Sequence, residues 1–146
     1  MNDHKPFVIE NIAKNLIFID GITRNGKSLF VGILPSLDRV EHINVIFLLE
    51  QTLPAVSLGI LDAQYLKVLM RLHLNELAYN IQIGRNVNFR YTDHTGVLNY
   101  KDPQVYYKRL SLKEGDTIVE KLLHSDLCIP FKTHDLLVNL EYLNLL

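Results

Sequence analysis

Cysteine is almost missing from this sequence: Cys128 is the only one among 146 residues. A framework of internal disulfides is therefore excluded, and a lone thiol is compatible with a reducing compartment. Long apolar runs are missing too, since no window approaches the roughly 20 consecutive apolar residues that span a bilayer. The first residues, MNDHKPFVIENIAKN, lack the apolar core of a signal peptide. These absences predict a cytoplasmic protein without a membrane span.

An excess of charge of one sign is absent as well. The 15 Lys and Arg residues nearly balance the 16 Asp and Glu residues, and the formal net charge is −1 at pH 7. Nucleic-acid-binding domains normally carry a basic patch, so no nucleic-acid partner is expected and any anion site must be local. His4, His42 and His124 show no metal-ligand spacing with one another or with Cys128, so no metal site is predicted.

What is present is an alternation of strand and helix patterns. Residues 16–20, LIFID, form a short apolar run that predicts a buried strand. Apolar positions at helical spacing follow Lys27, and Pro35 is expected to kink or end that helix near Leu34. A strand or the start of a buried helix is predicted at 44–50, and a long helix from an N-cap at Asp62 to a stop at Gly84. Residues 85–100 are predicted as an ordered loop, in which a short strand is an option. Further helices are predicted at 102–110 (Pro103 in its first position), 116–124 and 136–146, and a strand leading to a loop at 127–134.

This alternation predicts an α/β fold with a mainly parallel sheet. Repeats and linkers rich in Gly, Ser or Pro are absent, so residues 1–146 are expected to form a single domain. Only two or three convincing strands appear, and an apolar helical stretch comes last. We therefore expect the N-terminal part of a larger fold, incomplete at its C-terminus.

A phosphate-binding loop is predicted between the first strand and the first helix. Its sequence satisfies the pattern G-x-x-x-x-G-K-[ST] in the required strand–loop–helix context. Glycines allow backbone N–H groups to turn towards an anion, and the helix N-terminus adds partial positive charge. The alternative is an ordinary turn with an exposed lysine. The predicted ligand-binding residues are Gly21, Thr23, Arg24, Asn25, Gly26, Lys27 and Ser28.

The same pattern occurs in kinases and NTPases, which use ATP or GTP with magnesium. Such an enzyme needs Mg²⁺ held by the loop serine, here Ser28, and by an acidic residue at the end of another strand. Glu50 is the one candidate for that second ligand. A helix-start or surface carboxylate is the other interpretation of Glu50, so both remain open.

A second motif, IPFKTHDLL, stands at residues 129–137. It resembles the strand of the cytosolic-type sulfotransferases that ends in Lys-Thr-His. In that family the first strand runs into a phosphosulfate-binding loop of the form Pro-Lys/Arg-Ser-Gly-Thr-Thr, and TRNGKS at residues 23–28 is similar in register. Arg24 and Gly26 match the basic residue and the glycine, whereas Thr23 replaces the proline.

The resemblance covers roughly residues 16–137 and implies a P-loop-type, three-layer fold. It implies 3′-phosphoadenosine 5′-phosphosulfate as the sulfuryl donor and a hydroxyl or amine on a small molecule, sugar or lipid as the acceptor. His134 becomes the base that takes the acceptor proton, because imidazole titrates near neutral pH. Lys132, on the same side of the strand, becomes the cation that stabilises the bridging oxygen.

The family grips the 3′-phosphate with an Arg and a Ser that lie beyond this strand. The chain ends before such an element, so a truncated protein without turnover is the non-catalytic alternative.

A polar stretch, GRNVNFRYTDH at residues 84–94, supplies candidates for substrate binding. Arg85 and Arg90 can bind an acidic acceptor or a phosphate, and Asp93 can orient a hydroxyl. Loops of this kind often determine specificity in α/β domains. A solvated loop pinned by salt bridges is the alternative.

Overall fold

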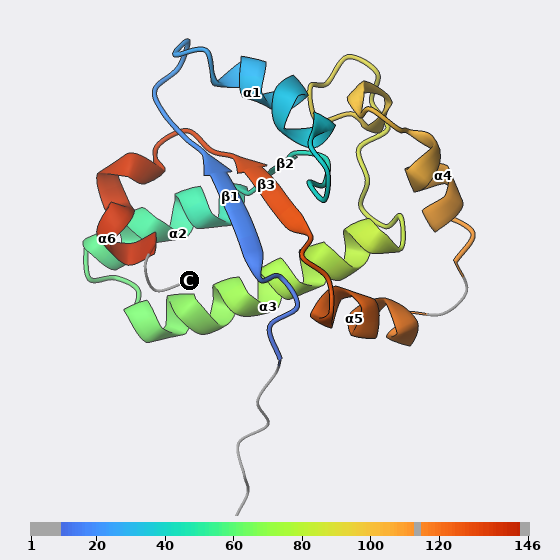
Figure 1. Cartoon of the computed structure of the whole chain (residues 1–146). Coiled ribbons are helices and arrows are strands. Elements are labelled where there is room, and N and C mark those ends of the chain that lie inside the picture. The colour runs from blue at the N-terminus through green and yellow to red at the C-terminus, as the bar shows by residue number, and fades with distance from the viewer. Residues whose placement is uncertain (1–9, 113–114, 144–146) are drawn as a thin grey trace, which may run out of the picture.

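The sheet at the centre of the computed structural model is small and entirely parallel. The structure describes residues 10–112 and 115–143. Its strands are β1 (Asn15–Ile19), β2 (Asn44–Val45) and β3 (Cys128–Lys132), in the order β1-β3-β2. β3 therefore lies beside β1 although most of the chain separates them (Figure 1). The predicted α/β class with a parallel sheet is confirmed.

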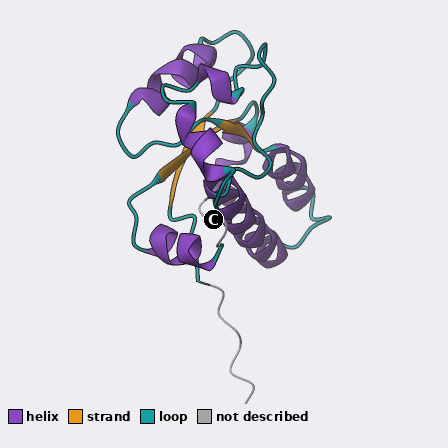
Figure 2. Ribbon diagram, turned by 90° about the vertical axis from the view of Figure 1, so that its right-hand side faces the viewer, coloured by secondary structure: helices purple, strands orange, loops and turns teal. Residues whose placement is uncertain are grey.

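Helices surround this sheet (Figure 2). None of those described is long and apolar enough to cross a membrane. They are α1 (Lys27–Ile33), α2 (Phe47–Ser57), α3 (Ala63–Gln82), α4 (Gln104–Arg109), α5 (Asp116–Leu123) and α6 (Leu140–Leu143), with 3₁₀ turns at Leu34–Ser36, Val97–Asn99 and Leu136–Asn139.

Several helix ends lie where the sequence predicts them. The Asp62 side chain caps α3 by accepting a hydrogen bond from the backbone N–H of Tyr65 at 2.9 Å. Gly84 follows the same helix with a φ of +72°, a left-handed conformation that ends helices at little cost for glycine. Pro35 lies in the 3₁₀ turn directly after α1, so it ends that helix as expected.

Three predicted segments differ in detail. Residues 44–50 are both a strand and a helix start, since β2 ends at Val45 and α2 begins at Phe47. Pro103 was predicted as the first residue of its helix, but it is the N-cap of α4, which begins at Gln104. The last predicted helix is a 3₁₀ turn followed by α6, and its final residues, 144–146, lie outside the described part of the chain.

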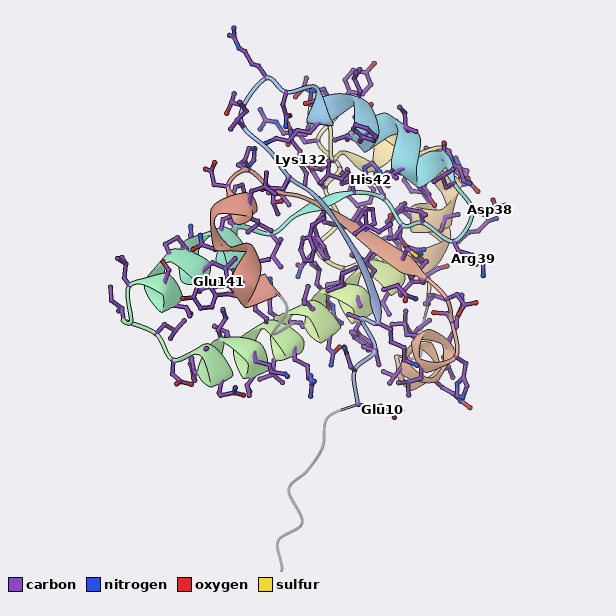
Figure 3. The ribbon with its side chains drawn as sticks, turned by 60° about the vertical axis from the view of Figure 1, so that its left-hand side comes forward. Glu10, Asp38, Arg39, His42, Lys132 and Glu141 are labelled. Atoms are coloured by element: carbon purple, nitrogen blue, oxygen red, sulfur yellow. The ribbon has the colours of Figure 1, made fainter. Side chains whose placement is uncertain are left out.

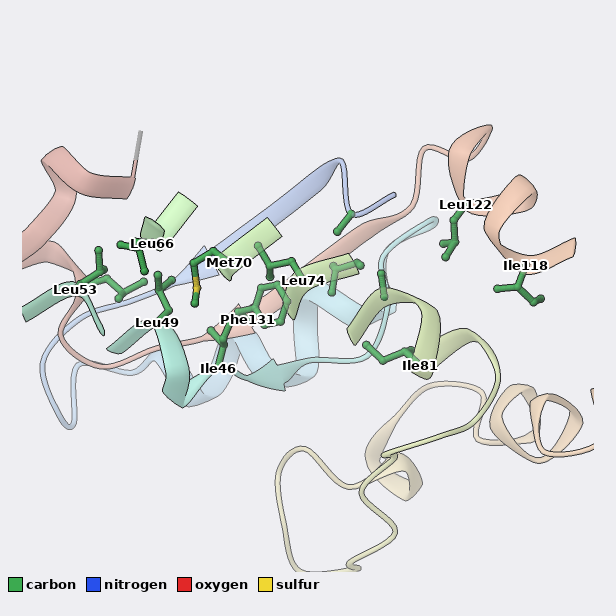
Figure 4. Close-up of a cluster of buried hydrophobic side chains, with 14 of the residues drawn as sticks. Ile46, Leu49, Leu53, Leu66, Met70, Leu74, Ile81, Ile118, Leu122 and Phe131 are labelled. Atoms are coloured by element: carbon green, nitrogen blue, oxygen red, sulfur yellow. The ribbon is translucent and has the colours of Figure 1, made fainter. Parts of the chain in front are cut away.

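The core lies mainly on one face of the sheet. Strand side chains alternate between faces, and the paired residues Leu16–Ile129 and Phe18–Phe131 point into a large cluster with α2, α3 and α5. The labelled side chains of this cluster are shown in Figure 4. Ile19 belongs to a second, smaller cluster with α1. Helices therefore pack on both faces of the sheet.

Glu41 is the centre of a buried polar cluster between the sheet and α4. Its carboxylate is 1% exposed and forms an ion pair with Arg109 at 2.8 Å. It also accepts hydrogen bonds from the Gln82 amide at 2.8 Å, the backbone N–H of His42 at 2.9 Å and the Tyr106 hydroxyl. A charge this deeply buried requires such partners. The cluster ties α3 and α4 to the segment that leads into β2.

His42 makes folding stability depend on pH. Burial lowers the pKa of its imidazole below the ordinary 6.5. Nearby backbone groups and Glu41 raise this pKa, but by less than burial lowers it. The unfolded chain therefore takes up a proton near pH 6.5 that the folded chain does not. We expect the free energy of unfolding to fall as the pH is lowered from 6.5, by at most about 1.4 kcal/mol per pH unit.

Urea unfolding between pH 7.5 and 5 measures this slope. His42→Phe keeps a ring against Tyr100 and Tyr106, whose centroids lie 5.4 and 6.5 Å from that of His42, and removes the titrating group. Its slope should be shallower than that of the parent chain. Equal slopes would assign the pH dependence to other groups.

Candidate phosphate loop and sheet-edge site

The predicted phosphate loop connects β1 to α1 through unusual backbone conformations. Gly21, Arg24 and Gly26 have positive φ values of +138°, +67° and +86°. At Gly26 no atom lies within 4 Å of where a Cβ would stand, so open space borders the loop there. The side chains of Thr23, Arg24 and Ser28 are exposed around this space. The loop is therefore open to a ligand from solvent.

Lys27 lies inside this loop. It is only 7% exposed, and its ammonium group donates a hydrogen bond to the backbone carbonyl of Gly21. Its backbone N–H donates to Asn25 Oδ1 at 3.1 Å. A bound phosphate would replace both acceptors with its own oxygens. The exposed Arg24 guanidinium and Ser28 hydroxyl fit a phosphate group, and the Lys27 ammonium would have to leave the Gly21 carbonyl to join them.

Asp20 connects this loop to the segment after β3. Its Oδ2 accepts a hydrogen bond from the backbone N–H of Leu137 at 2.9 Å, and the Thr133 backbone N–H donates to the Ile19 carbonyl at 3.0 Å. Burial raises the pKa of Asp20, but hydrogen bonds from Leu137, the Thr133 side chain and neighbouring backbone groups outweigh it and leave the pKa lowered. The two predicted motifs therefore meet at the carboxyl edge of the sheet.

His134 is held by Glu50 at this edge. Glu50 Oε1 accepts a hydrogen bond from the His134 backbone N–H at 2.7 Å and lies 3.1 Å from Nδ1. The Glu50 side chain is 17% exposed and that of His134 39%. A carboxylate at Nδ1 favours the tautomer with its proton there, which leaves Nε2 as an acceptor. Glu50 thus positions the imidazole.

Lys132 and His134 were predicted to lie on the same side of a strand, but the structure places them in different surroundings. β3 ends at Lys132, so strand alternation does not extend to His134. Lys132 lies at the carboxyl end of β3 (Figure 3) and lines a cavity of about 480 Å³. Val45, its neighbour on β2, lines the same cavity. His134 contacts Glu50 on α2 instead.

The three predicted substrate residues separate in the structure. Asp93 lines the cavity beside Lys132. Arg90 is exposed and pairs with Asp93, with 3.3 Å between Arg90 Nε and Asp93 Oδ1. Arg85 is exposed after the end of α3 and does not line this cavity. A salt bridge of the kind expected in the alternative interpretation is therefore present between Arg90 and Asp93. Asp93 also lines the cavity.

Sequence patterns missed the part that two residues play in this region. Phe47 lines the cavity as the first residue of α2 and belongs to no motif. Asn88 lies within the polar stretch 84–94 and holds its loop by donating to Asp93 Oδ2 at 3.1 Å and to Thr95 Oγ1 at 2.9 Å, contacts that the sequence does not indicate. Their proximity depends on how residues 85–100 fold back over β2, which no local pattern encodes.

Metal-ligating side chains do not gather here. Within residues 10–112 and 115–143, no group of three or more His, Cys, Asp or Glu side chains is arranged to hold a metal ion. The sheet-edge site, defined as the loop 21–28 with Lys132, His134 and Glu50, therefore offers cations, a hydroxyl and an imidazole oriented by a carboxylate.

Known proteins do not supply a function for this site. Comparisons of the chain with protein-family models, with curated proteins and with solved structures found no match. What the chain does must therefore be argued from the geometry of the sheet-edge site.

Proposed function

We propose that this chain is a sulfotransferase-type domain that binds a phosphosulfate donor at residues 21–28 and uses His134 as the base. The parallel pairing of β1 with β3 carries the proposal. Parallel strands end at the same edge of a sheet, where α/β proteins bind their ligands. The two motifs that resemble the family therefore meet where a phosphate ligand and an acceptor would meet.

The donor would be 3′-phosphoadenosine 5′-phosphosulfate. When bound, it supplies the sulfuryl group, and its bridging oxygen keeps the electron pair of the broken S–O bond. Lys27 and Arg24 would neutralise the charge that grows on that oxygen. Lys132 would bring a third cation from the end of β3. A P-loop-type, three-layer arrangement is part of the same proposal, supported by helices on both faces of the sheet.

His134 would take the proton of the acceptor hydroxyl as the new oxygen–sulfur bond forms. Its Nε2 is the free acceptor when Glu50 holds the proton on Nδ1, and the Glu50 carboxylate would stabilise the imidazolium that results. A carboxylate, an imidazole and a hydroxyl in this order form the usual arrangement for proton removal near neutral pH.

A kinase or NTPase is the second candidate, supported by the match of residues 21–28 to the nucleoside-triphosphate pattern. It would place Mg²⁺ on Ser28 and Glu50. The contacts of Glu50 with His134 favour the first candidate, since they already occupy Oε1.

Calorimetric titration separates the two candidates. We expect adenosine 3′,5′-bisphosphate to bind without metal, and ATP to bind weakly with or without Mg²⁺. Arg24→Ala should weaken binding of the bisphosphate about tenfold, because it removes a charge-assisted hydrogen bond. His134→Ala should weaken it less, since His134 acts on the acceptor.

Arg71→Ala is the matched control, since Arg71 is an exposed basic residue on α3. Binding of ATP that requires Mg²⁺ would move the assignment to a kinase or NTPase. Binding of neither nucleotide would favour a protein without turnover. Equal losses in Arg24→Ala and His134→Ala would contradict the division between phosphate loop and base.

A further inference from the structure

We infer that the cavity beside Lys132 binds a saccharide as the acceptor. The role as acceptor rests on the proposed sulfuryl transfer. Binding of the saccharide itself does not depend on a nucleotide at residues 21–28. The cavity has a volume of about 480 Å³, within the usual range for small-molecule sites. We call it the acceptor cavity.

One wall of the acceptor cavity is apolar. Val45 ends β2 and Phe47 begins α2, and both line it. Phe47 is 60% exposed, although it lies in a segment whose next residues Leu48 and Leu49 pack into the core. An aromatic ring held in this position by a helix offers a rigid, flat surface.

A second part of the lining is polar and is held by hydrogen bonds. The Asn88 amide donates to both Asp93 and Thr95, and the Asn88 Oδ1 accepts from the backbone N–H of Arg90 at 2.9 Å. The Asp93 carboxylate is balanced by Arg90, and the Asp93 backbone carbonyl accepts from the Asn99 amide at 2.7 Å. The Asn88 amide, the Thr95 hydroxyl and the Asp93 carboxylate are therefore held in place.

A sugar ring fits these two walls. Its C–H face is apolar and packs on an aromatic ring, while its hydroxyls both donate and accept hydrogen bonds. Asn88, Thr92, Asp93 and His94 provide the matching polar groups. Apolar atoms make up the larger part of the lining surface, which suits the C–H face of a sugar but also an apolar acceptor, so the test must include apolar probes as competitors.

Lys132 links the cavity to the proposed reaction. It closes β3, the central strand, and its side chain lines the cavity on the side of the sheet edge. Within the residues that the structure describes, Lys132 forms no salt bridge with a carboxylate. His134 and residues 21–28 do not line the cavity, so the reacting hydroxyl of the sugar would have to extend past Lys132 to reach the sheet-edge site.

Saturation-transfer NMR on the full chain tests the acceptor cavity without any nucleotide. The probes are glucose, galactose, N-acetylglucosamine, glucuronic acid and lactose, with 4-nitrophenol and octanol as competing chemical classes. We expect at least one saccharide to bind, with its ring protons receiving saturation. Phe47→Ala should weaken that binding about tenfold through loss of ring packing, and Asp93→Ala should weaken it through loss of hydrogen bonds.

Two controls keep the outcomes distinct. Tyr65→Ala removes an equally exposed aromatic residue on α3 and should leave saccharide binding unchanged. Lys27→Ala should abolish bisphosphate binding but leave saccharide binding unchanged. Saccharide binding without nucleotide binding would support the cavity and refute the proposed function. If the chain binds the nucleotide but binds only 4-nitrophenol or octanol among the probes, the saccharide inference is overturned. Nucleotide binding with no bound probe overturns it as well.

Discussion

Replacing Arg109 by methionine is expected to lower the free energy of unfolding by about 3–5 kcal/mol, because it leaves a buried carboxylate without its counter-charge. Arg109 Nη2 lies 2.8 Å from Glu41 Oε2, and the two side chains are 13% and 1% exposed. Arg109 also donates to the Ile81 carbonyl at 3.2 Å, and its guanidinium carbon stands 4.7 Å from the centre of the Tyr106 ring. All of these contacts are lost together.

Arg39→Met is the matched control. Arg39 and Asp126 are 3.0 Å apart, nearly the same distance, but their side chains are 71% and 79% exposed. Exposed pairs contribute about 0–1 kcal/mol, so this variant should remain close to the parent chain. Adding Glu41→Gln to Arg109→Met removes the orphaned charge and should recover part of the loss. Urea unfolding at pH 7.5 measures all three, and equal effects of Arg109→Met and Arg39→Met would contradict the argument.

Glu41 also marks the limit of what the sequence predicts. Its partners Gln82, Tyr106 and Arg109 lie far away along the chain, on α3 and α4. Nothing in the local sequence around Glu41 distinguishes it from a surface carboxylate. Pairings of this kind depend on tertiary packing, which sequence periodicity does not encode.

Elements with a strong local cause were predicted well. The long helix α3 has both an N-cap at Asp62 and a repeating apolar face, and the loop after β1 has a motif. The helix α2 was not predicted beyond Glu50, because the periodicity of residues 44–50 fits both a strand and the start of a buried helix, and Pro54 lies inside the helix. Buried Leu49 and Leu53 hold α2 against the core in spite of that proline. Packing thus outweighed local propensity.

The candidate site shows the same division. Residues 21–28 are predicted as a phosphate loop from spacing alone and His134 as a base from a short motif, and both roles stay predictions. The contact between His134 and Glu50 was not predicted, because the sequence indicates Glu50 only as a metal ligand, a helix-start carboxylate or a surface carboxylate; Glu50 does lie in the first turn of α2. The structure brings α2 to the end of β3 and gives Glu50 a specific partner.

The contact between Glu50 and His134 leads to the largest functional effect that we expect. If the chain transfers a sulfuryl group as proposed, His134→Ala should reduce kcat by about 10²–10⁴-fold, the usual contribution of a positioned general base. Binding of adenosine 3′,5′-bisphosphate should change little. The measurement is release of the bisphosphate in the presence of a saccharide that binds the acceptor cavity, with His124→Ala, an exposed histidine at the end of α5, as control.

Glu50→Gln tests the positioning role of the carboxylate. It keeps the size of the side chain but removes the charge that favours the Nδ1–H tautomer of His134. We expect kcat to fall while KM stays nearly constant, and the pH profile of kcat to shift. The ¹⁵N chemical shifts of the His134 ring should report a larger fraction of the Nε2–H tautomer, which a merely structural role of Glu50 would not produce. Full turnover in His134→Ala would refute the base, and an unchanged tautomer in Glu50→Gln would refute the positioning contact.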